Sequence, residues 1–471
     1  MTLLRLLAPV LVDHARVPGV WLRDPDGYAA FWGQQQERTD RASRVRAAAE
    51  GVEQPRFVFE HVRPARSLNL YRRIDDTGTD RAPHVLSGEL AAAHLPRTFP
   101  GGASPVGQVL EVSFRLHDHG ILLVEAMLEV GPWLAARTGS LEDRLDELQD
   151  AAVSLGESLA RECVTQWVDP LLARVRAADR RHEVLEAPAA ADEPGTADLG
   201  DALWVTRSLV LAPDHPDTAA AVRHWTKDVG RAQGEADPAQ DLLEGRADHH
   251  ARWLNYVFLD RDGAGAAVLP DGRFRDEWSG LRYAQFFYGA LDRIDSRLAR
   301  VLADSAAATA HWEVAGLKEQ LVALSQRAEL VLMDRQDLAK YLKRSVRREL
   351  DALLDVWDHE LLLERPVRFK IETCDRRLAE LSARRTARSA MFTDIILLGI
   401  GVTSILATAL ALTDFGRGLR ANPSSASYDL GASAVTQWLA SQPADAILAA
   451  SATVSLLLVV LYLVFRRDHG S

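Results

Sequence analysis

The chain has 471 residues, too many for one ordinary domain, and a formal net charge of -11. Because nucleic-acid binding needs clustered Lys and Arg to displace counterions, this acidic balance argues against a nucleic acid partner. The two cysteines, Cys163 and Cys374, lie far apart in helix-like patterns, which predicts no disulfide framework and fits a reducing compartment. Arg5 and Asp13 interrupt the first apolar stretch, so we expect no signal peptide.

Residues 1–185 predict a cytosolic α/β (or α+β) region. Apolar, β-branched and aromatic residues alternate or run together, as they do in strands, in "RFVFEHVR", "QVLEVSFRLHDHG" and "ILLVEAMLEV". The segment from His117 to Gly120 predicts a hairpin turn between the last two strands. From Leu141 to Leu185, apolar residues at three- and four-residue spacing predict an amphipathic helix with a kink or break at Pro170.

A linker and a second part of the cytosolic region follow. Residues 186–200 contain Pro, Ala, Gly and acidic residues without periodicity, which predicts a linker. Residues 201–276 contain two further strand patterns, "ALWVTRSLVLA" and "ARWLNYVFLD", separated by the helical "DTAAAVRHWTKDV".

Residues 277–390 predict a long helical or stalk region. One amphipathic helix covers "LRYAQFFYGALDRIDSRLARVLAD", and a second begins near Trp312. Apolar residues then repeat at heptad spacing and form a predicted seam: Leu317, Leu321, Leu324, Ala328, Val331, Leu338, Leu342, Val346, Leu350, Leu353, Trp357, Leu361, Ile371, Cys374, Leu378 and Leu381. Pro366 breaks or turns the helix. The seam predicts self-association, and packing within one chain is the alternative.

Two apolar runs near the end of the chain predict a transmembrane hairpin. The runs, 391–412 and 446–465, are each long enough to span about 30 Å of hydrocarbon; buried core helices are the alternative. The residues between them, 413–445, form a predicted extracytoplasmic loop, and 466–471 a basic cytosolic tail. Because Arg residues cluster before the first run and after the second, we expect both termini in the cytoplasm and a multi-pass protein of the inner membrane, in contact with lipid.

The first apolar run carries a stripe of small or polar residues. Asp394, Gly401, Thr408 and Phe415 recur every seven residues, with Ser404 between them. Such a stripe either packs closely against another helix or lines a watery pore. These residues are therefore candidates for pore-lining positions.

The order of cytosolic domain, long helices, stalk and two spans resembles that of the CorA-type divalent-cation (magnesium) channel superfamily. This resemblance implies a homo-oligomer, a pentamer in that family, whose first span lines the pore. The family signature, Gly-Met-Asn after an aromatic residue, corresponds here to Phe415-Gly416-Arg417-Gly418, in which the aromatic residue and the first Gly match. A ring of Arg417 would oppose entry of Mg²⁺. The alternative is that Gly416 or Gly418 simply ends the helix.

No sequence motif predicts an enzyme. Nucleotide-binding, zinc-protease and serine-hydrolase patterns are missing from the sequence, so we expect no catalytic residues and no cofactor beyond a divalent cation such as Mg²⁺. His117 with His119, and His249 with His250, are weak metal candidates because each pair lacks further ligands. Two functions remain: a CorA-like channel for divalent cations with a degenerate selectivity loop, or a non-conducting, membrane-anchored sensor or effector whose cytosolic domain binds a ligand or partner protein.

Overall fold

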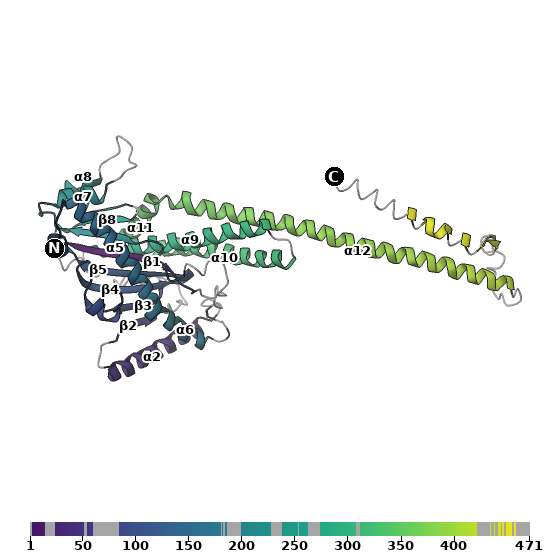
Figure 1. Ribbon diagram of the computed structural model, residues 1–471, viewed down its shortest axis with the longest axis horizontal. Helices are drawn as coiled ribbons and strands as arrows, with labels where there is room; N and C mark the ends of the chain where they lie inside the picture. Colours follow the sequence, from purple (N-terminus) through teal and green to yellow (C-terminus); the bar gives the residue numbers. More distant parts are fainter. Residues whose placement is uncertain are drawn as a thin grey trace. The chain divides into compact units, whose positions relative to one another are not determined.

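A computed structural model shows one mixed sheet followed by long helices (Figure 1). It describes residues 2–14, 24–50, 54–59, 84–179, 181, 184–185, 199–227, 238–252, 254–261, 274–307, 311–421, 434, 438, 441–443, 445–446, 449–454 and 456–457. The chain divides into two units. The first comprises Met1–Ala308 and Gly316–Asp375, and the second comprises Thr309–Ala315 and Arg376–Ser471.

The sheet has eight strands in the order β2-β3-β4-β5-β1-β6-β8-β7. The strands are β1 (Leu3–Leu11), β2 (Arg56–Phe59), β3 (His84–Leu90), β4 (Gln108–His117), β5 (Ile121–Glu129), β6 (Thr206–Leu211), β7 (His249–Ala251) and β8 (Asn255–Leu259). Neighbouring strands are antiparallel except for β6 and β8, which are parallel. The predicted α/β or α+β body is therefore present.

Helices connect and cover these strands. They are α2 (Pro25–Glu50), η2 (Ala92–His94), η3 (Pro100–Gly102), η4 (Asp118–Gly120), α4 (Gly131–Ala135), α5 (Leu141–Cys163), η5 (Val164–Val168), α6 (Asp169–Ala178), α7 (Thr218–Trp225), α8 (Pro238–Leu243), α9 (Arg275–Ala307), α10 (His311–Tyr341), α11 (Arg344–Val356), η7 (Glu360–Glu364) and α12 (Arg365–Ala421). The predicted break near Pro170 is a π-helical turn, η5, after which Pro170 lies in the first turn of α6.

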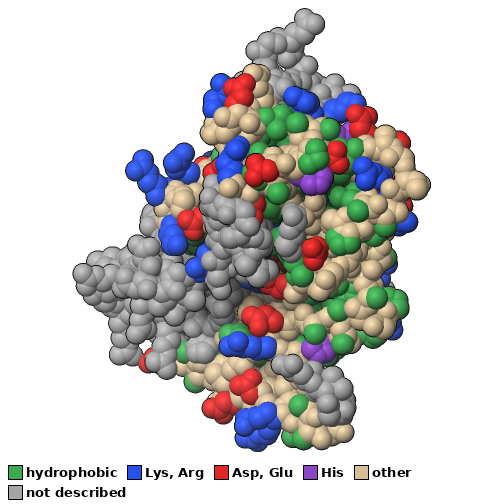
Figure 2. All heavy atoms as spheres, turned by 90° about the vertical axis from the view of Figure 1, so that its left-hand side faces the viewer, with side chains coloured by type: hydrophobic (Ala, Val, Ile, Leu, Met, Phe, Trp, Pro, Cys, Tyr) green, Lys and Arg blue, Asp and Glu red, His purple; other side chains and the backbone are tan. Residues whose placement is uncertain are grey.

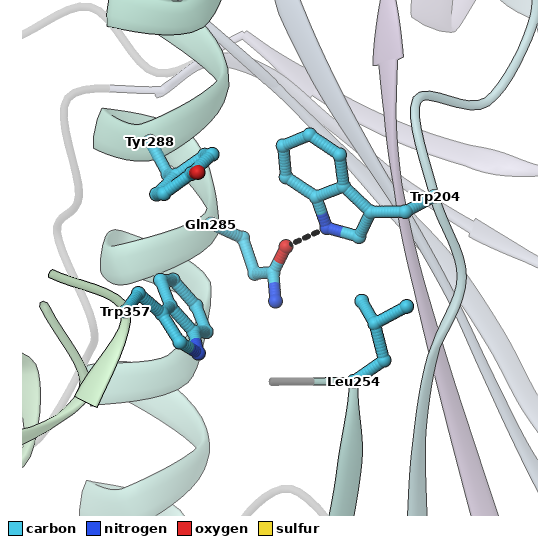
Figure 3. A pocket seen from close by; sticks show the side chains of 5 residues that line it. All are labelled: Trp204, Leu254, Gln285, Tyr288 and Trp357. Carbon is cyan, nitrogen blue, oxygen red and sulfur yellow. Dashed lines mark hydrogen bonds between the residues drawn. The ribbon is translucent and has the colours of Figure 1, made fainter. Parts of the chain in front are cut away.

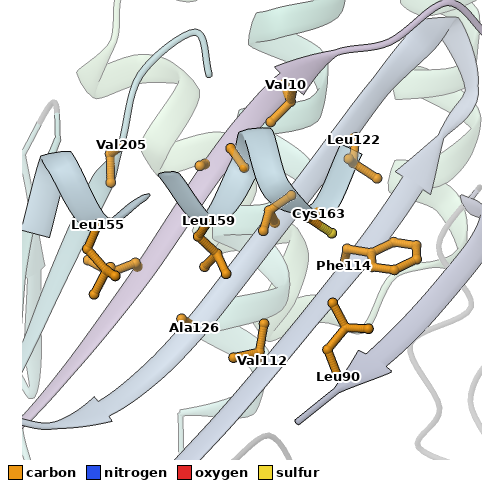
Figure 4. Packing of buried hydrophobic residues seen from close by; sticks show 14 of the residues in the cluster. Val10, Leu90, Val112, Phe114, Leu122, Ala126, Leu155, Leu159, Cys163 and Val205 are labelled. Atoms are coloured by element: carbon orange, nitrogen blue, oxygen red, sulfur yellow. The ribbon is translucent and has the colours of Figure 1, made fainter. Parts of the chain in front are cut away.

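Helix α5 covers the apolar face of the sheet. It begins at the N-cap Ser140, whose Oγ accepts a hydrogen bond from the backbone N–H of Asp143 at 3.1 Å. Its Leu155 and Leu159 point at the strands (Figure 4), and each such buried leucine contributes about 1.5–3 kcal/mol. Gly156 lets the helix approach closely, because a Cβ there would lie 2.6 Å from Val205 Cγ1.

The β4–β5 hairpin confirms the prediction for residues 108–130. The two strands pair in antiparallel register from Gln108 opposite Glu129 to His117 opposite Ile121. Between them the chain reverses through His119 at φ 65° and Gly120 at φ 74°, the left-handed region that short turns require.

Helix α9 covers the other face of the sheet and packs against α11. At Gly280 the two helices are so close that a Cβ would lie 2.7 Å from Glu349 Cβ. The predicted seam is largely buried within the single chain: Leu321, Ala328, Leu350 and Leu378 are each at most 4 % exposed. The seam therefore fits the alternative of packing within one chain, and self-association stays a prediction.

The predicted transmembrane hairpin requires correction. The first apolar run, 391–412, is an inner stretch of the 57-residue helix α12, which continues through Gly416 and Gly418 to Ala421. Charged residues precede and follow this stretch, and Asp394 lies within it. Across the residues that the structure describes, no helix has the length and apolar composition needed to cross a membrane. The predictions of a transmembrane hairpin and of a multi-pass protein of the inner membrane are therefore wrong on this finding.

The remaining C-terminal predictions fall largely outside the described residues. Of the second run, only 446, 449–454 and 456–457 are described, and the tail 466–471 and residues 422–433 of the loop are not. In α12, residues 384–396 are described by their backbone alone.

Candidate functional site

The face of the sheet toward α9 carries polar side chains. Because successive strand residues point to opposite faces, Arg5 and Glu125 lie opposite the apolar residues that α5 covers. On the strands beyond β1, Thr206 and Tyr256 occupy the same face and are buried. We call these buried polar groups, which lie between the sheet and α9 among apolar residues such as Leu123 and Met127, the polar layer.

Glu125 is the centre of a buried charge cluster in this layer. Its Oε1 accepts hydrogen bonds from Arg115 Nη1 and Arg282 Nε, each at 2.7 Å, and its Oε2 pairs with Arg5. The Arg5 guanidinium also lies over the Trp278 ring, 4.4 Å from its centroid. The cluster joins β1, β4 and β5 to α9.

The charges around Glu125 keep it ionised. Burial alone would raise the pKa of Glu125, but the charges of Arg282, Arg5 and Arg115 and the hydrogen bond from Arg282 lower it well below its usual range. Glu125 pairs with all three arginines within the cluster. We therefore assign the cluster to stability and not to ligand binding.

A small cavity lies at the other end of the polar layer (Figure 3). It is lined by Trp204, Leu254, Gln285, Tyr288 and Trp357 and has a volume of about 10 Å³, room for one water molecule. Gln285, Tyr288 and Trp357 are buried, whereas Trp204 and Leu254 are half-buried. Trp204 and Leu254 are therefore the most solvent-exposed residues of its lining.

Three aromatic rings form the walls of this cavity. The Tyr288 ring is nearly perpendicular to the Trp204 ring, at 88° and 5.5 Å between centroids, and to the Trp357 ring, at 90° and 5.7 Å. Edge-to-face pairs of this kind stabilise each other beyond their buried area. The arrangement holds the rings in a corner around the cavity.

Gln285 is fixed in one orientation at the centre of the site. An indole N–H can only donate, so the atom that Trp204 Nε1 meets is the Gln285 oxygen (Figure 3). The Gln285 Nε2 donates to Thr206 Oγ1 at 2.8 Å. One lone pair of Gln285 Oε1 is used by Trp204, and a carbonyl oxygen has two.

Tyr288 is neutral at physiological pH. Burial, followed by the charge of Asp292 one turn along α9, raises the pKa of Tyr288 to about 12. Its phenol is therefore a polar group without charge.

Trp357 is positioned by an irregular segment between α11 and η7. Asp358, the next residue, has φ 49°, a left-handed conformation that is costly for a residue with a side chain. The following His359 is 1 % exposed, and its Nδ1 lies 3.3 Å from Glu364 Oε1, which also pairs with Arg335. These contacts hold the segment behind the Trp357 ring.

One face of α9 connects the cavity to the start of α12. Tyr288, Asp292 and Asp295 follow at spacings of four and three residues and so share a face. Asp295 Oδ2 pairs with Lys370 Nζ at 2.6 Å, and Leu298 O accepts a contact from Cys374 Sγ at 3.7 Å. Helix α9 therefore lines the cavity with one part and holds residues 365–375 with the next.

The sequence-predicted pore candidates lie along α12 and do not converge. Gly401, Ser404, Thr408 and Phe415 are exposed, and Thr408 Oγ1 donates to Ser404 O at 2.8 Å within the helix. The structure does not describe the side chains of Asp394 and Arg417 or the surroundings of Gly416. Their proposed role stays a prediction.

The histidine pairs make contacts other than metal ligation. The His117 ring stacks on Phe286 at 4.7 Å, and His119 pairs with Asp334 at 3.2 Å. His249 Nε2 lies 2.9 Å from Glu349 Oε2. Among the residues with described positions, no group of three or more His, Cys, Asp or Glu could hold a metal ion.

Charge on the surface is mixed. On the face drawn in Figure 2, basic and acidic side chains lie among one another, and the coloured atoms form no continuous basic area. The expectation that nucleic acid is not a partner stays a prediction.

The sequence did not predict the cavity, although two signals were available. The segment "YAQFFYGA" places Gln285 and Tyr288 on a helix whose residues 278–291 are buried on every side, which is unusual for a surface helix. Trp204 and Trp357 are large aromatic residues within predicted elements, and aromatic side chains often line ligand pockets.

Comparison with protein-family models, with curated proteins and with solved structures found no match to this chain.

Proposed function

We propose that the chain is a ligand-responsive sensor or effector whose sheet domain binds a small molecule in the aromatic cavity. The observation that carries this proposal is the position of α9, which supplies Gln285 and Tyr288 to the cavity and, two turns further, Asp295 to the start of α12. A ligand that moves α9 changes the contacts that hold residues 365–375. In this proposal the cavity recognises the ligand, and α9 and the start of α12 carry the structural response.

Ligand sites are lined mainly by apolar and aromatic side chains with a few oriented polar groups, and this cavity has such a lining on a much smaller scale. Gln285 is pre-organised by its bonds to Trp204 and Thr206, which lowers the ordering cost of binding. Because the cavity holds only one water-sized group in this state, a ligand inserts an end group and leaves its remainder at the Trp204 and Leu254 side.

A filling variant tests whether the cavity binds. Fragments are screened by ligand-observed NMR against the wild type and against Leu254→Trp, which fills the cavity. Val322→Trp is the matched control, because Val322 is 56 % exposed on α10 and the added side chain is the same. We expect a set of fragments that bind the wild type and Val322→Trp but not Leu254→Trp.

Hydrogen exchange then tests the response. A bound fragment is expected to change amide exchange in residues 365–375 as well as in α9. The proposal is refuted if no fragment distinguishes Leu254→Trp from Val322→Trp, or if bound fragments leave exchange in residues 365–375 unchanged.

A further inference from the structure

The outer edge of the sheet at β2 is covered by a side chain of α2. Strand β2 comes first in the strand order, so among the strands that the structure describes only β3 pairs with it. Helix α2 lies on its other side (Figure 1). There Gln36 Nε2 donates to Phe57 O at 3.0 Å, and Gln36 Oε1 accepts from the Phe59 N–H at 2.8 Å. One residue of a neighbouring strand would donate and accept in the same way, so the Gln36 amide stands where strand pairing would occur.

The Gln36 amide is held in this orientation by its neighbours. A backbone N–H only donates and an ionised carboxylate only accepts, so Phe59 meets the amide oxygen and Asp40 meets the amide nitrogen. The bond from Gln36 Nε2 to Asp40 Oδ1, one turn further along α2, is 2.8 Å long. One turn before Gln36, the buried Trp32 ring stacks on Phe59 with 5.6 Å between centroids. Contacts on both sides of Gln36 therefore fix α2 against the edge.

The two backbone groups that Gln36 covers match the same two groups of another copy of the chain. Phe57 O and Phe59 N point away from β3 and lie on either side of Val58. If two β2 strands pair in antiparallel fashion about a two-fold axis at Val58, the Phe59 N–H of each copy faces Phe57 O of the other. Each copy then offers one donor and one acceptor in the positions that its partner requires. Such a symmetric contact is the commonest way in which identical chains associate.

We propose that the outer edge of β2 is a docking site for β2 of a second copy, and that Gln36 keeps this site closed. Displacement of the amide together with α2 opens the edge, and two chains then join their sheets through residues 56–59. This edge shares no residue with the aromatic cavity or with the heptad seam.

A matched pair of glutamine substitutions tests whether the amide closes the edge. Gln36→Leu removes both hydrogen bonds and keeps a helix-forming side chain of similar size. Gln34→Leu is the control, because it makes the same chemical change at an exposed position of the same helix. Sedimentation velocity on the full chain is expected to show a species of twice the wild-type mass for Gln36→Leu and the wild-type distribution for Gln34→Leu.

A cysteine substitution at Val58 then locates the contact. On the proposed two-fold axis the Val58 Cα atoms of the two copies would be about 4.5 Å apart, which is within disulfide range. The native Cys163 and Cys374 are buried and so do not compete. Under mild oxidation we expect Val58→Cys to cross-link two chains about tenfold faster in combination with Gln36→Leu than with Gln34→Leu, because two hydrogen bonds no longer hold the edge closed.

Cross-linking at Val58→Cys decides the outcome. Equal rates in the Gln36→Leu and Gln34→Leu backgrounds overturn the proposal, whatever the masses, because any association then occurs elsewhere. Faster cross-linking with Gln36→Leu supports it, even where the contact is too weak to change the mass. If circular dichroism shows that Gln36→Leu does not fold, Gln36→Glu takes its place, since a carboxylate still accepts from Phe59 but has no N–H for Phe57 O, and the same two outcomes apply.

Discussion

Replacing Glu125 with glutamine is expected to destabilise the sheet domain more than any exposed charge change. Glutamine keeps one oxygen, which can still meet Arg115 and Arg282, but places an NH₂ group against the Arg5 guanidinium. The change removes one charge-assisted hydrogen bond, worth about 1.5–3 kcal/mol, outright. It also leaves the buried guanidinium groups of Arg5 and Arg282 and the half-buried one of Arg115 without their shared carboxylate, and breaking a buried pair costs about 3–5 kcal/mol.

Urea unfolding followed by circular dichroism measures this loss. We expect Glu125→Gln to lower the free energy of unfolding by about 3–5 kcal/mol with an unchanged dependence on urea. The control is Asp201→Asn, because the ion pair of Asp201 with Arg161 is more than half exposed on both sides and such pairs contribute under about 1 kcal/mol. A Glu125→Gln loss as small as that of the control would refute the reasoning.

The pH dependence of Glu125 provides a second check on the same cluster. The folded-state pKa of Glu125 lies well below its usual value, so its stabilising effect is fully present above the unfolded pKa. The effect is lost as pH falls through the folded pKa. We expect the stability difference between wild type and Glu125→Gln to be constant at neutral pH and to shrink only in acid.

Three further predictions concern other parts of the domain. Gly280→Ala is expected to destabilise the fold in thermal unfolding, because the 2.7 Å approach of its Cβ to Glu349 costs about 1–3 kcal/mol and outweighs a helix gain of about 1 kcal/mol; a rise in melting temperature contradicts this. Burial lowers the pKa of His249, but the hydrogen bond and the charge of Glu349 raise it by more. The pKa of His249 in the folded state therefore lies above its usual value. The pair then stabilises fully below about pH 6.5 and less as pH rises through the folded pKa, and the pH profile of urea midpoints should flatten in Glu349→Gln. Cys163 and Cys374 are both buried thiols, so a thiol reagent should modify them only as the domain unfolds, and fast labelling of folded protein would be inconsistent with this.

Local patterns predicted the strands and helices whose sequences alternate clearly. The β4–β5 hairpin and helices α5 and α9 follow from residues that are near one another in the chain. Strand β1 was not predicted, because a central strand is buried on both faces and "LLRLLAPVL" shows no alternation. Arg5 interrupts that run, and only the fold reveals its partner Glu125.

The candidate site could not be derived from local patterns. Its lining residues come from the segment before β6, the residue before β8, α9 and the residue after α11, and no periodicity relates these segments. The seam was recognised as apolar, but heptad spacing describes one helix face and does not say whether the same chain or another copy covers it.

The central place of β1 determines when the sheet domain can form during synthesis. Leu3 pairs with Glu129 on one side and with Val210 on the other, so the first strand made has both neighbours far along the chain. The charge cluster that Arg5 forms around Glu125 can be completed only after Arg282 of α9 has been synthesised. Closing such distant contacts is slow. The N-terminal strand therefore leaves the ribosome as an unpaired apolar segment, and nascent chains that end before α9 are expected to depend on chaperones to remain soluble.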